Sequence, residues 1–176
     1  MKRIHFKKIH STHLYAKENL PSFKDHSEII ITAEYQTGGI GRRMDKWLSP
    51  PNCSLLATYI YPAPPLPLCL YLSKLAALSL KKTLEPLNLP ITFKEPNDLL
   101  INKKKISGIL SEICSDKMLT SIGLNISQTE DDLQSINQPA TSLLLETGKT
   151  LSSELLLEQF LKNFLFDLAI LKKSFQ

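Results

Sequence analysis

Residues 38–47, with the sequence GGIGRRMDKW, carry the residue types that could bind an anion. Three of the chain's six glycines lie here within four positions. Glycine tolerates positive φ, so successive backbone N–H groups can face one negative group. Arg42, Arg43 and Lys46 add positive charge, and Trp47 could stack on a nucleobase. The segment is neither a P-loop nor a Rossmann turn. The alternative is a flexible surface loop with solvated charges and a tryptophan that anchors the core.

A second group of polar residues surrounds the sequence KEPND at residues 94–98. Lys94, Asn97 and Asp98 follow a short strand, and a hairpin is expected to return Lys105 close to them. A lysine there could neutralise a carboxylate or a phosphate, and Asp98 could hold that lysine or bind Mg²⁺. Gly108, inside a strand, suggests that a ligand approaches the backbone. The alternative is an ordinary turn followed by a solvated hairpin tip.

Other sequence features give weaker signals. His10 and His13 are three residues apart, but no cysteine or acidic cluster completes a zinc site, so no resident metal site is predicted. Residues 147–150 (TGKT) resemble the end of a P-loop, but the upstream glycine is missing. Cys114 is interpreted as a small core residue rather than a nucleophile.

These residues must be positioned by a mixture of strands and helices. Apolar and β-branched runs predict strands near residues 1–9, 28–34, 53–61, 91–94, 99–101, 106–113 and 118–127. Helices are expected at 13–20, 68–84 and 152–171, and the last carries an apolar stripe spaced by three and four residues. Residues 35–52 and 128–142 are expected to be loops. Because long helices do not alternate with the strands, we predict an α+β fold with a mixed, mostly antiparallel sheet and helices packed on one face.

Length and composition limit the class of protein. The chain has 176 residues, is 43% apolar and carries a formal charge of +4 (21 basic minus 17 acidic residues). It is expected to form one domain, residues 1–176, with no transmembrane helix and no secretory signal. Three scattered cysteines favour a reducing, cytoplasmic location over a disulfide framework. The mild positive charge permits an anionic ligand but does not indicate a nucleic-acid-binding or membrane-binding protein.

Taken together, the motifs resemble the catalytic domain of biotin–protein ligases, in the biotin/lipoate ligase superfamily. The resemblance rests on motifs that occur in the family's order and cover nearly the whole chain: HST (10–12), AEYQTGGIGRR (33–43), KWLSP (46–50), KEPND (94–98), KISGIL (105–110), GLN (123–125) and ATSL (140–143). It implies a class II synthetase-like fold. It also implies an enzyme that joins biotin to ATP as biotinyl-AMP, with Mg²⁺, and then to a lysine of an acceptor domain.

The resemblance also implies roles for individual residues. Catalysis is assigned to Lys105, Arg42 and Asp98. The residues expected to bind biotin are Ser11, Thr12, His13, Gln36, Gly39, Ile40, Gly41, Arg42, Lys105 and Gly108. Those expected to bind the nucleotide are Arg42, Arg43, Lys46, Trp47, Lys94, Asn97 and Asn125.

The chain departs from the family pattern at several positions. Ile40 replaces a usual arginine, while Asp45 and Glu95 introduce acidic groups, which should weaken the capture of anions. A ligase for lipoate or another acyl group, and a non-catalytic domain that binds biotin or its acceptor, are therefore the alternatives. The expected partner is a biotin-acceptor domain, such as the biotin carboxyl carrier of acetyl-CoA carboxylase. No nucleic-acid or membrane partner, no N-terminal DNA-binding domain, no C-terminal β-domain and a monomer or weak homodimer are expected.

Overall fold

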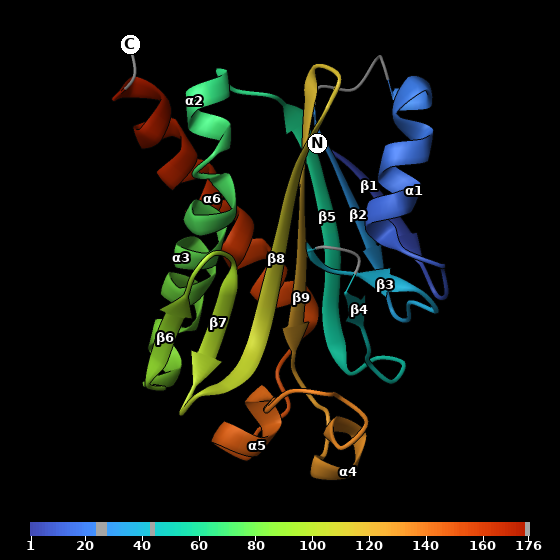
Figure 1. Ribbon diagram of the computed structural model, residues 1–176, viewed down its shortest axis with the longest axis vertical. Coiled ribbons are helices and arrows are strands. Elements are labelled where there is room, and N and C mark those ends of the chain that lie inside the picture. Colours follow the sequence, from blue (N-terminus) through green and yellow to red (C-terminus); the bar gives the residue numbers. More distant parts are fainter. Residues whose placement is uncertain (24–27, 43–44, 175–176) are drawn as a thin grey trace.

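A seven-stranded sheet forms the centre of the molecule in a computed structural model that describes residues 1–23, 28–42 and 45–174 (Figure 1). From one edge to the other its strands are β1 (Lys2–Phe6), β2 (Ile29–Ala33), β5 (Ser54–Pro62), β9 (Lys117–Asn125), β8 (Lys104–Cys114), β7 (Asp98–Ile101) and β6 (Ile91–Lys94). Only the β1–β2 pair in this sheet is parallel. A separate two-stranded hairpin consists of β3 (Gly39–Ile40) and β4 (Lys46–Trp47).

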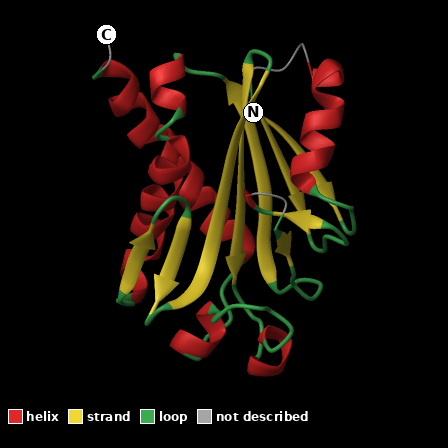
Figure 2. Cartoon of the chain, viewed as in Figure 1, coloured by secondary structure: helices red, strands yellow, loops and turns green. Residues whose placement is uncertain are grey.

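Helices cover both faces of the sheet, as the cartoon shows (Figure 2). The long helices α3 (Leu72–Leu84) and α6 (Ser153–Lys173) pack against each other on one face. The shorter α1 (Thr12–Asn19) and the 3₁₀ turn η1 (Leu20–Phe23) lie on the other face, beside β1 and β2 (Figure 1). The remaining short helices are α2 (Leu66–Cys69), η3 (Glu85–Leu87), α4 (Glu130–Leu133) and α5 (Leu143–Thr147).

The two faces of the sheet contribute to two separate apolar clusters. Side chains alternate along β2, so Ile30 joins the larger cluster with α3 and α6, while Ile29 and Ile31 join the smaller cluster under α1. In the larger cluster the fully buried Phe164 of α6 lies against the ring of Tyr61 on β5. The sheet is therefore held by apolar packing on both of its faces.

The predicted α+β class and the mixed, mostly antiparallel sheet are confirmed, and both long helices share one face. Three details differ from the expectation. The short α1 covers the opposite face, the predicted helix at 68–84 is divided between α2 and α3 near Tyr71, and residues 35–52 contain the β3–β4 hairpin. The contact face of α3 includes Ala76, Ala77 and Leu80, whereas Leu78 is 42% exposed.

No helix among the described residues is both long and apolar enough to cross a membrane.

Candidate functional site

Two neighbouring glycines form the floor of a trough across the middle of the sheet. Gly108 of β8 pairs with Gly123 of β9 and, on its other side, with Asp98 of β7. Leu56 of β5 continues the same row beyond Gly123. A Cβ atom on Gly123 would lie 2.5 Å from the Trp47 ring, and one on Gly108 would lie 3.2 Å from the Lys105 ammonium. The absence of side chains at these two positions therefore makes room for Trp47 and Lys105 above the sheet.

A β-bulge directs Lys105 into this trough. The register between β7 and β8 shifts at Leu99 and Leu100, so Leu100 pairs with Lys105 while Leu99 pairs with Ser107. A bulge of this kind redirects the side chains that follow it. The Lys105 backbone is also held from its other side, because its N–H donates to the Pro139 carbonyl at 2.8 Å and its carbonyl accepts from the Thr141 N–H at 2.9 Å.

Lys105 and Asp98 form the most enclosed ion pair on the cleft wall. The Lys105 ammonium lies 2.8 Å from Asp98 Oδ1, and the two side chains are only 19% and 16% exposed. This buried carboxylate oxygen has no other donor within the described part of the chain. Asp98 therefore retains acceptor capacity toward a ligand or an incoming amine, and it keeps the ammonium over Gly108.

The β3–β4 hairpin covers one side of the trough. Gly39 pairs with Trp47, and the turn is closed where the Gly41 N–H donates to the Asp45 carbonyl at 2.6 Å. The Trp47 ring lies over Gly123, with the Lys105 ammonium 5.9 Å from its centre. Its indole N–H is buried and has no partner in the described residues. The hairpin thus places an aromatic face and a free donor beside a cation.

The turn at residues 94–98 borders the opposite side. The Asn97 amide donates to the Ile109 carbonyl at 2.6 Å, which fastens this turn to β8. Lys94 is exposed at the cleft wall. The Lys74 ammonium on the neighbouring α3 donates to Glu95 Oε1 at 3.1 Å. The Lys74 contact partly neutralises one of the two acidic groups that were expected to weaken anion capture.

The far end of the cleft is lined by small polar groups rather than by charges. The start of α1 places Ser11 and Thr12 here, both nearly fully buried. Gln36 accepts at its Oε1 from the Thr12 backbone N–H at 2.6 Å and from the Thr12 hydroxyl at 2.9 Å. The residue types match a neutral, polar ligand group at this end.

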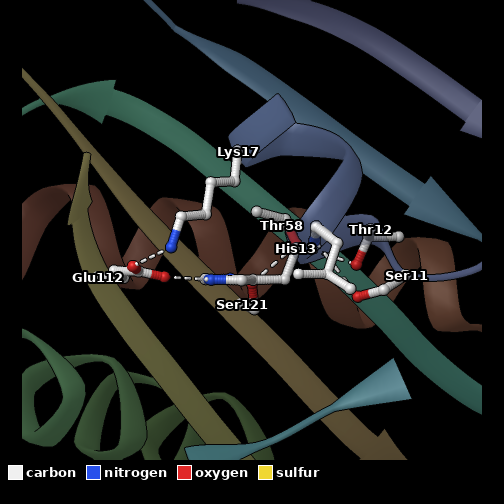
Figure 3. A network of polar contacts seen from close by, with 8 residues as sticks. Ser11, Thr12, His13, Lys17, Thr58, Glu112 and Ser121 are labelled. Atoms are coloured by element: carbon white, nitrogen blue, oxygen red, sulfur yellow. Dashed lines mark hydrogen bonds and ion pairs between the residues drawn. The ribbon is translucent and has the colours of Figure 1, made fainter. Parts of the chain in front are cut away.

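His13 connects this polar end to the surface (Figure 3). Its Nδ1 lies 2.8 Å from the Ser121 hydroxyl, and its Nε2 lies 2.8 Å from Glu112, which also accepts from Lys17 at 2.6 Å. Burial raises the pKa of Glu112, but the hydrogen bonds from Lys17 and His13 outweigh it and hold the pKa below its usual value. The Glu112 hydrogen bond raises the pKa of Lys17. Glu112 is therefore ionised at neutral pH.

These parts enclose one cleft of about 730 Å³, and most of the predicted site residues line it. The residues that meet there are Ser11, Thr12, His13, Gln36, Ile40, Gly41, Arg42, Lys46, Trp47, Lys94, Asn97, Asp98, Lys105 and Gly108. They come from five strands, one helix N-terminus and the turns between them, so the fold collects residues that are up to 97 positions apart in sequence, from Ser11 to Gly108.

Two predicted residues, Gly39 and Asn125, do not line the cleft. Gly39 packs closely against Gln36 and Trp47. A Cβ atom on Gly39 would lie 2.8 Å from Gln36 Nε2 and 2.9 Å from the Trp47 carbonyl oxygen. Asn125 is 2% exposed and donates to the Thr141 carbonyl at 2.9 Å, because the segment after β9 covers it. The structure therefore does not bring Asn125 to the cleft wall. Arg43 lies outside the described residues.

Sequence reasoning missed several residues of the cleft. Ser121 lines it, and Thr58 and Glu112 support it from the sheet. The sequence feature that could have identified them is a hydroxyl or a carboxylate inside an otherwise apolar strand. Residues 135–138 also line the wall, although nothing in that polar stretch distinguished them.

This arrangement can hold two anionic groups in contact. Arg42, Lys46, Lys94 and Lys105 supply positive charge along one part of the cleft, and Lys105 lies near its middle. Converging cations offset the repulsion between two anions, and a site enclosed by a covering hairpin limits competing water.

Comparisons with known proteins agree with this geometry. Residues 5–128 match the Biotin/lipoate A/B protein ligase family. The Bifunctional ligase/repressor BirA of Bacillus spizizenii is 30% identical over 147 residues, which cover 79% of this chain and 44% of that protein. A solved structure, the biotin protein ligase from Aquifex aeolicus in complex with biotin and ATP, superposes with a TM-score of 0.82 at 29% identity. That match covers 98% of this chain and 72% of the Aquifex chain.

The chain therefore belongs to the Biotin/lipoate A/B protein ligase family. A further relative, the Biotin--[acetyl-CoA-carboxylase] ligase of Mycobacterium tuberculosis, is 28% identical over 126 residues, with 68% of this chain and 46% of that protein covered. The chain spans less than half the length of these two curated relatives.

Proposed function

We propose that this protein is an ATP-dependent biotin–protein ligase, which forms biotinyl-AMP and transfers biotin to a lysine of an acceptor domain. The observation that carries the proposal is Lys105, held over Gly108 by Asp98 between a polar end and a cationic end of one cleft. The named relatives and the Aquifex complex with biotin and ATP support the same choice of substrates.

The reaction has two steps. A carboxylate oxygen of biotin attacks the α-phosphorus of ATP, the bond to the β-phosphate breaks, and pyrophosphate leaves with its electron pair. The acceptor lysine amine then attacks the acyl carbon of biotinyl-AMP, AMP leaves, and the amine loses a proton as the amide forms. The first step joins two anions, so it needs cations at the point of contact.

The residues of the cleft divide between the two substrates. Ser11, Thr12 and Gln36 would bind the ring of biotin, with Ile40, Gly41 and Gly108 along its chain. Lys105 would contact both the biotin carboxylate and the α-phosphate, and Arg42 would stabilise the charge that develops there.

Trp47, Lys46, Lys94 and Asn97 would bind the nucleotide. Trp47 presents an aromatic face suited to stacking against a purine. Lys46 and Lys94, both exposed on the cleft wall, would meet the phosphates as they enter. The open acceptor capacity of Asp98 would let it receive the proton or orient the amine of the acceptor lysine.

Mg²⁺ would enter with the triphosphate as part of the substrate. Asp98 is a carboxylate that could complete its oxygen ligands, and Mg²⁺ is commonly held by one or two carboxylates and the phosphates.

The expected partner is a biotin-acceptor domain, such as the biotin carboxyl carrier of acetyl-CoA carboxylase. A monomer or weak homodimer working in the cytoplasm, as one catalytic domain, fits this proposal. Ile40 and Asp45 remain departures from the family pattern on the covering hairpin, so we expect slower adenylation than in a protein with basic residues at both positions.

The direct test is incubation of the protein with ATP, Mg²⁺, biotin and a purified acceptor domain, followed by detection of the biotinylated lysine by mass spectrometry. The proposal expects one modified lysine that requires ATP. Replacing biotin by lipoate serves as the matched control, and modification by lipoate alone would overturn the choice of substrate. No product at an enzyme concentration equal to that of the acceptor would overturn the proposal.

A further inference from the structure

A continuous path of hydrogen bonds runs from the surface of α1 to the polar end of the cleft (Figure 3). In order, the contacts join Lys17, Glu112, His13, Ser121, Thr58, Thr12 and Gln36, with separations of 2.6 to 2.9 Å. His13 is 2% exposed and Thr58 is fully buried, so water does not compete for these protons.

The donor and the acceptor in each of these hydrogen bonds can be assigned by starting from Gln36. The oxygen Oε1 of Gln36 accepts from the Thr12 backbone N–H, so the atom facing Thr12 is an acceptor only. The Thr12 hydroxyl must therefore give its single proton to Gln36 and accept from Thr58. Thr58 has then used its own proton, so Ser121 must donate to Thr58.

The same assignment of donors and acceptors determines which ring nitrogens of His13 carry protons. Since Ser121 donates to Thr58, its oxygen accepts from Nδ1–H of His13. Glu112, whose carboxylate is ionised, accepts from the other ring nitrogen at 2.8 Å. Both nitrogens of His13 therefore carry protons, and the charged ring is paired with the Glu112 carboxylate.

We propose that His13 is a positioning residue that, held by Glu112, fixes the donation order of Ser121, Thr58 and Thr12. Thr12 and Ser121, which both line the cleft, then offer oxygen lone pairs and no free proton to a ligand. That arrangement selects a ligand ring with N–H donors. This inference rests on the proposed function and deepens it, because the ureido ring of biotin has two N–H groups and the dithiolane ring of lipoate has none.

Substitution of Thr58 by valine tests the relay without touching the cleft wall. Thr58→Val keeps the shape and removes the middle hydroxyl, and we expect biotin to bind about tenfold more weakly, with ATP affinity unchanged. The matched control is Thr120→Val, a fully buried threonine on β9 whose hydroxyl contacts Tyr61 and Ser111 instead. Its biotin affinity should equal that of the wild type.

Isothermal titration of biotin into the wild type, Thr58→Val and Thr120→Val gives the decisive readings. The inference expects weaker biotin binding in Thr58→Val and wild-type binding in Thr120→Val. Unchanged biotin affinity in Thr58→Val would overturn the inference.

A measurement on the unliganded protein separates this inference from the proposed function. Nitrogen-15 NMR of the His13 ring, recorded under the conditions of the biotin titration, should show both nitrogens protonated, as the two ring contacts require. A bare Nδ1 would overturn the inference while leaving the ligase proposal intact. A wild-type protein with a protonated ring that binds no biotin would overturn the proposed function, and with it the assignment of the relay to biotin.

Discussion

At the scale of single residues, the chemistry of the cleft depends on where Lys105 is held. Its ammonium is 2.8 Å from Asp98, it lies over Gly108, and it is 5.9 Å from the centre of the Trp47 ring. The acidic partner fixes the position of the ammonium without removing its charge. A cation that is already in place when the substrates arrive has little reorganisation left to undergo in the transition state.

Removal of this cation should stop adenylation and leave the fold intact. For Lys105→Ala we expect a loss of about 10²- to 10³-fold in biotin-dependent pyrophosphate release, because the point of contact between two anions loses its charge. Lys104→Ala is the matched control, since Lys104 is the exposed neighbour on the same strand. Equal rates for both variants would contradict the role of Lys105, and thermal melting should show both folded.

The ion pair of Glu112 should give the protein a pH-dependent share of its stability. The pKa of Glu112 is lowered in the folded protein, so its contribution is present above the unfolded value and is lost as the pH falls through the folded one. Glu112→Gln should therefore destabilise the protein at about pH 7 and have a smaller effect at about pH 3. Because the Glu112 side chain is 37% exposed, the decrease in the free energy of unfolding should stay below about 1 kcal/mol.

Urea unfolding of the wild type and of Glu112→Gln at the two pH values provides the check. The pKa of Lys17 is raised in the folded protein. The contribution of its charge to the free energy of unfolding is therefore present at neutral pH and is lost only in strongly basic solution. A stability difference that is larger in acid than at neutral pH would be inconsistent with this pair.

At the scale of elements, the site depends on the registers of β7, β8 and β9. These registers align Asp98, Gly108 and Gly123 in one row, and the bulge in β8 directs Lys105 back across it. The β3–β4 hairpin then lies over the row through Trp47. A slip of one residue in any of these strands would turn side chains to the other face and dismantle the trough.

A methyl group on Gly123 should displace the hairpin. In Gly123→Ala the new Cβ would lie 2.5 Å from the Trp47 ring, so the ring must move away and should become more exposed. Trp47 is the chain's only tryptophan, so its fluorescence reports this directly, and we expect emission at longer wavelength and weaker ATP binding.

Gly108→Ala is the matched comparison for that experiment. There the added methyl group meets the flexible end of Lys105 at 3.2 Å rather than the indole ring, so tryptophan emission should stay close to that of the wild type. Unchanged emission in Gly123→Ala would show that Trp47 does not rest on that glycine in solution.

The sequence predicted the elements that carry a strong periodic pattern and missed those that tertiary contacts create. The apolar stripe of α6 was correctly assigned, since Leu157, Leu161, Phe164 and Leu168 are all buried. The β3–β4 hairpin has two residues in each strand, which is too short for any pattern to reveal.

At the site, motifs predicted Lys105 and Trp47, whereas the position of Asn125 depended on how the later segment folds over β9. Ser121 and Thr58 could not be connected to His13 from sequence, since the strands must first bring residues 63 and 108 positions apart into contact.

At the scale of the whole molecule, one layer of helices makes the sheet rigid enough to support a site on its other face. Helix α6 contributes Phe164, fully buried, with its ring 5.5 Å from that of Phe160 and 5.8 Å from that of Tyr61. The strand β5 that carries Tyr61 also carries Thr58 and Leu56 toward the cleft. Stability and site geometry are therefore linked through this central strand.

Truncation of Phe164 should lower the stability of the entire domain. For Phe164→Ala we expect a decrease of about 3–5 kcal/mol in the free energy of unfolding, because a large cavity opens between α6 and the sheet. Phe166→Ala, two residues along the same helix and 59% exposed, is the matched control and should change the value by less than about 0.5 kcal/mol. Similar losses for both variants in urea unfolding would contradict the packing described here.

The central claim is that this chain activates biotin with ATP, and exchange of labelled pyrophosphate into ATP measures that step without any acceptor protein. We expect exchange that requires biotin, is absent with lipoate, and is about 10²- to 10³-fold slower in Lys105→Ala but unchanged in Lys104→Ala. Absence of exchange in the wild-type protein at saturating biotin, ATP and Mg²⁺ would contradict it.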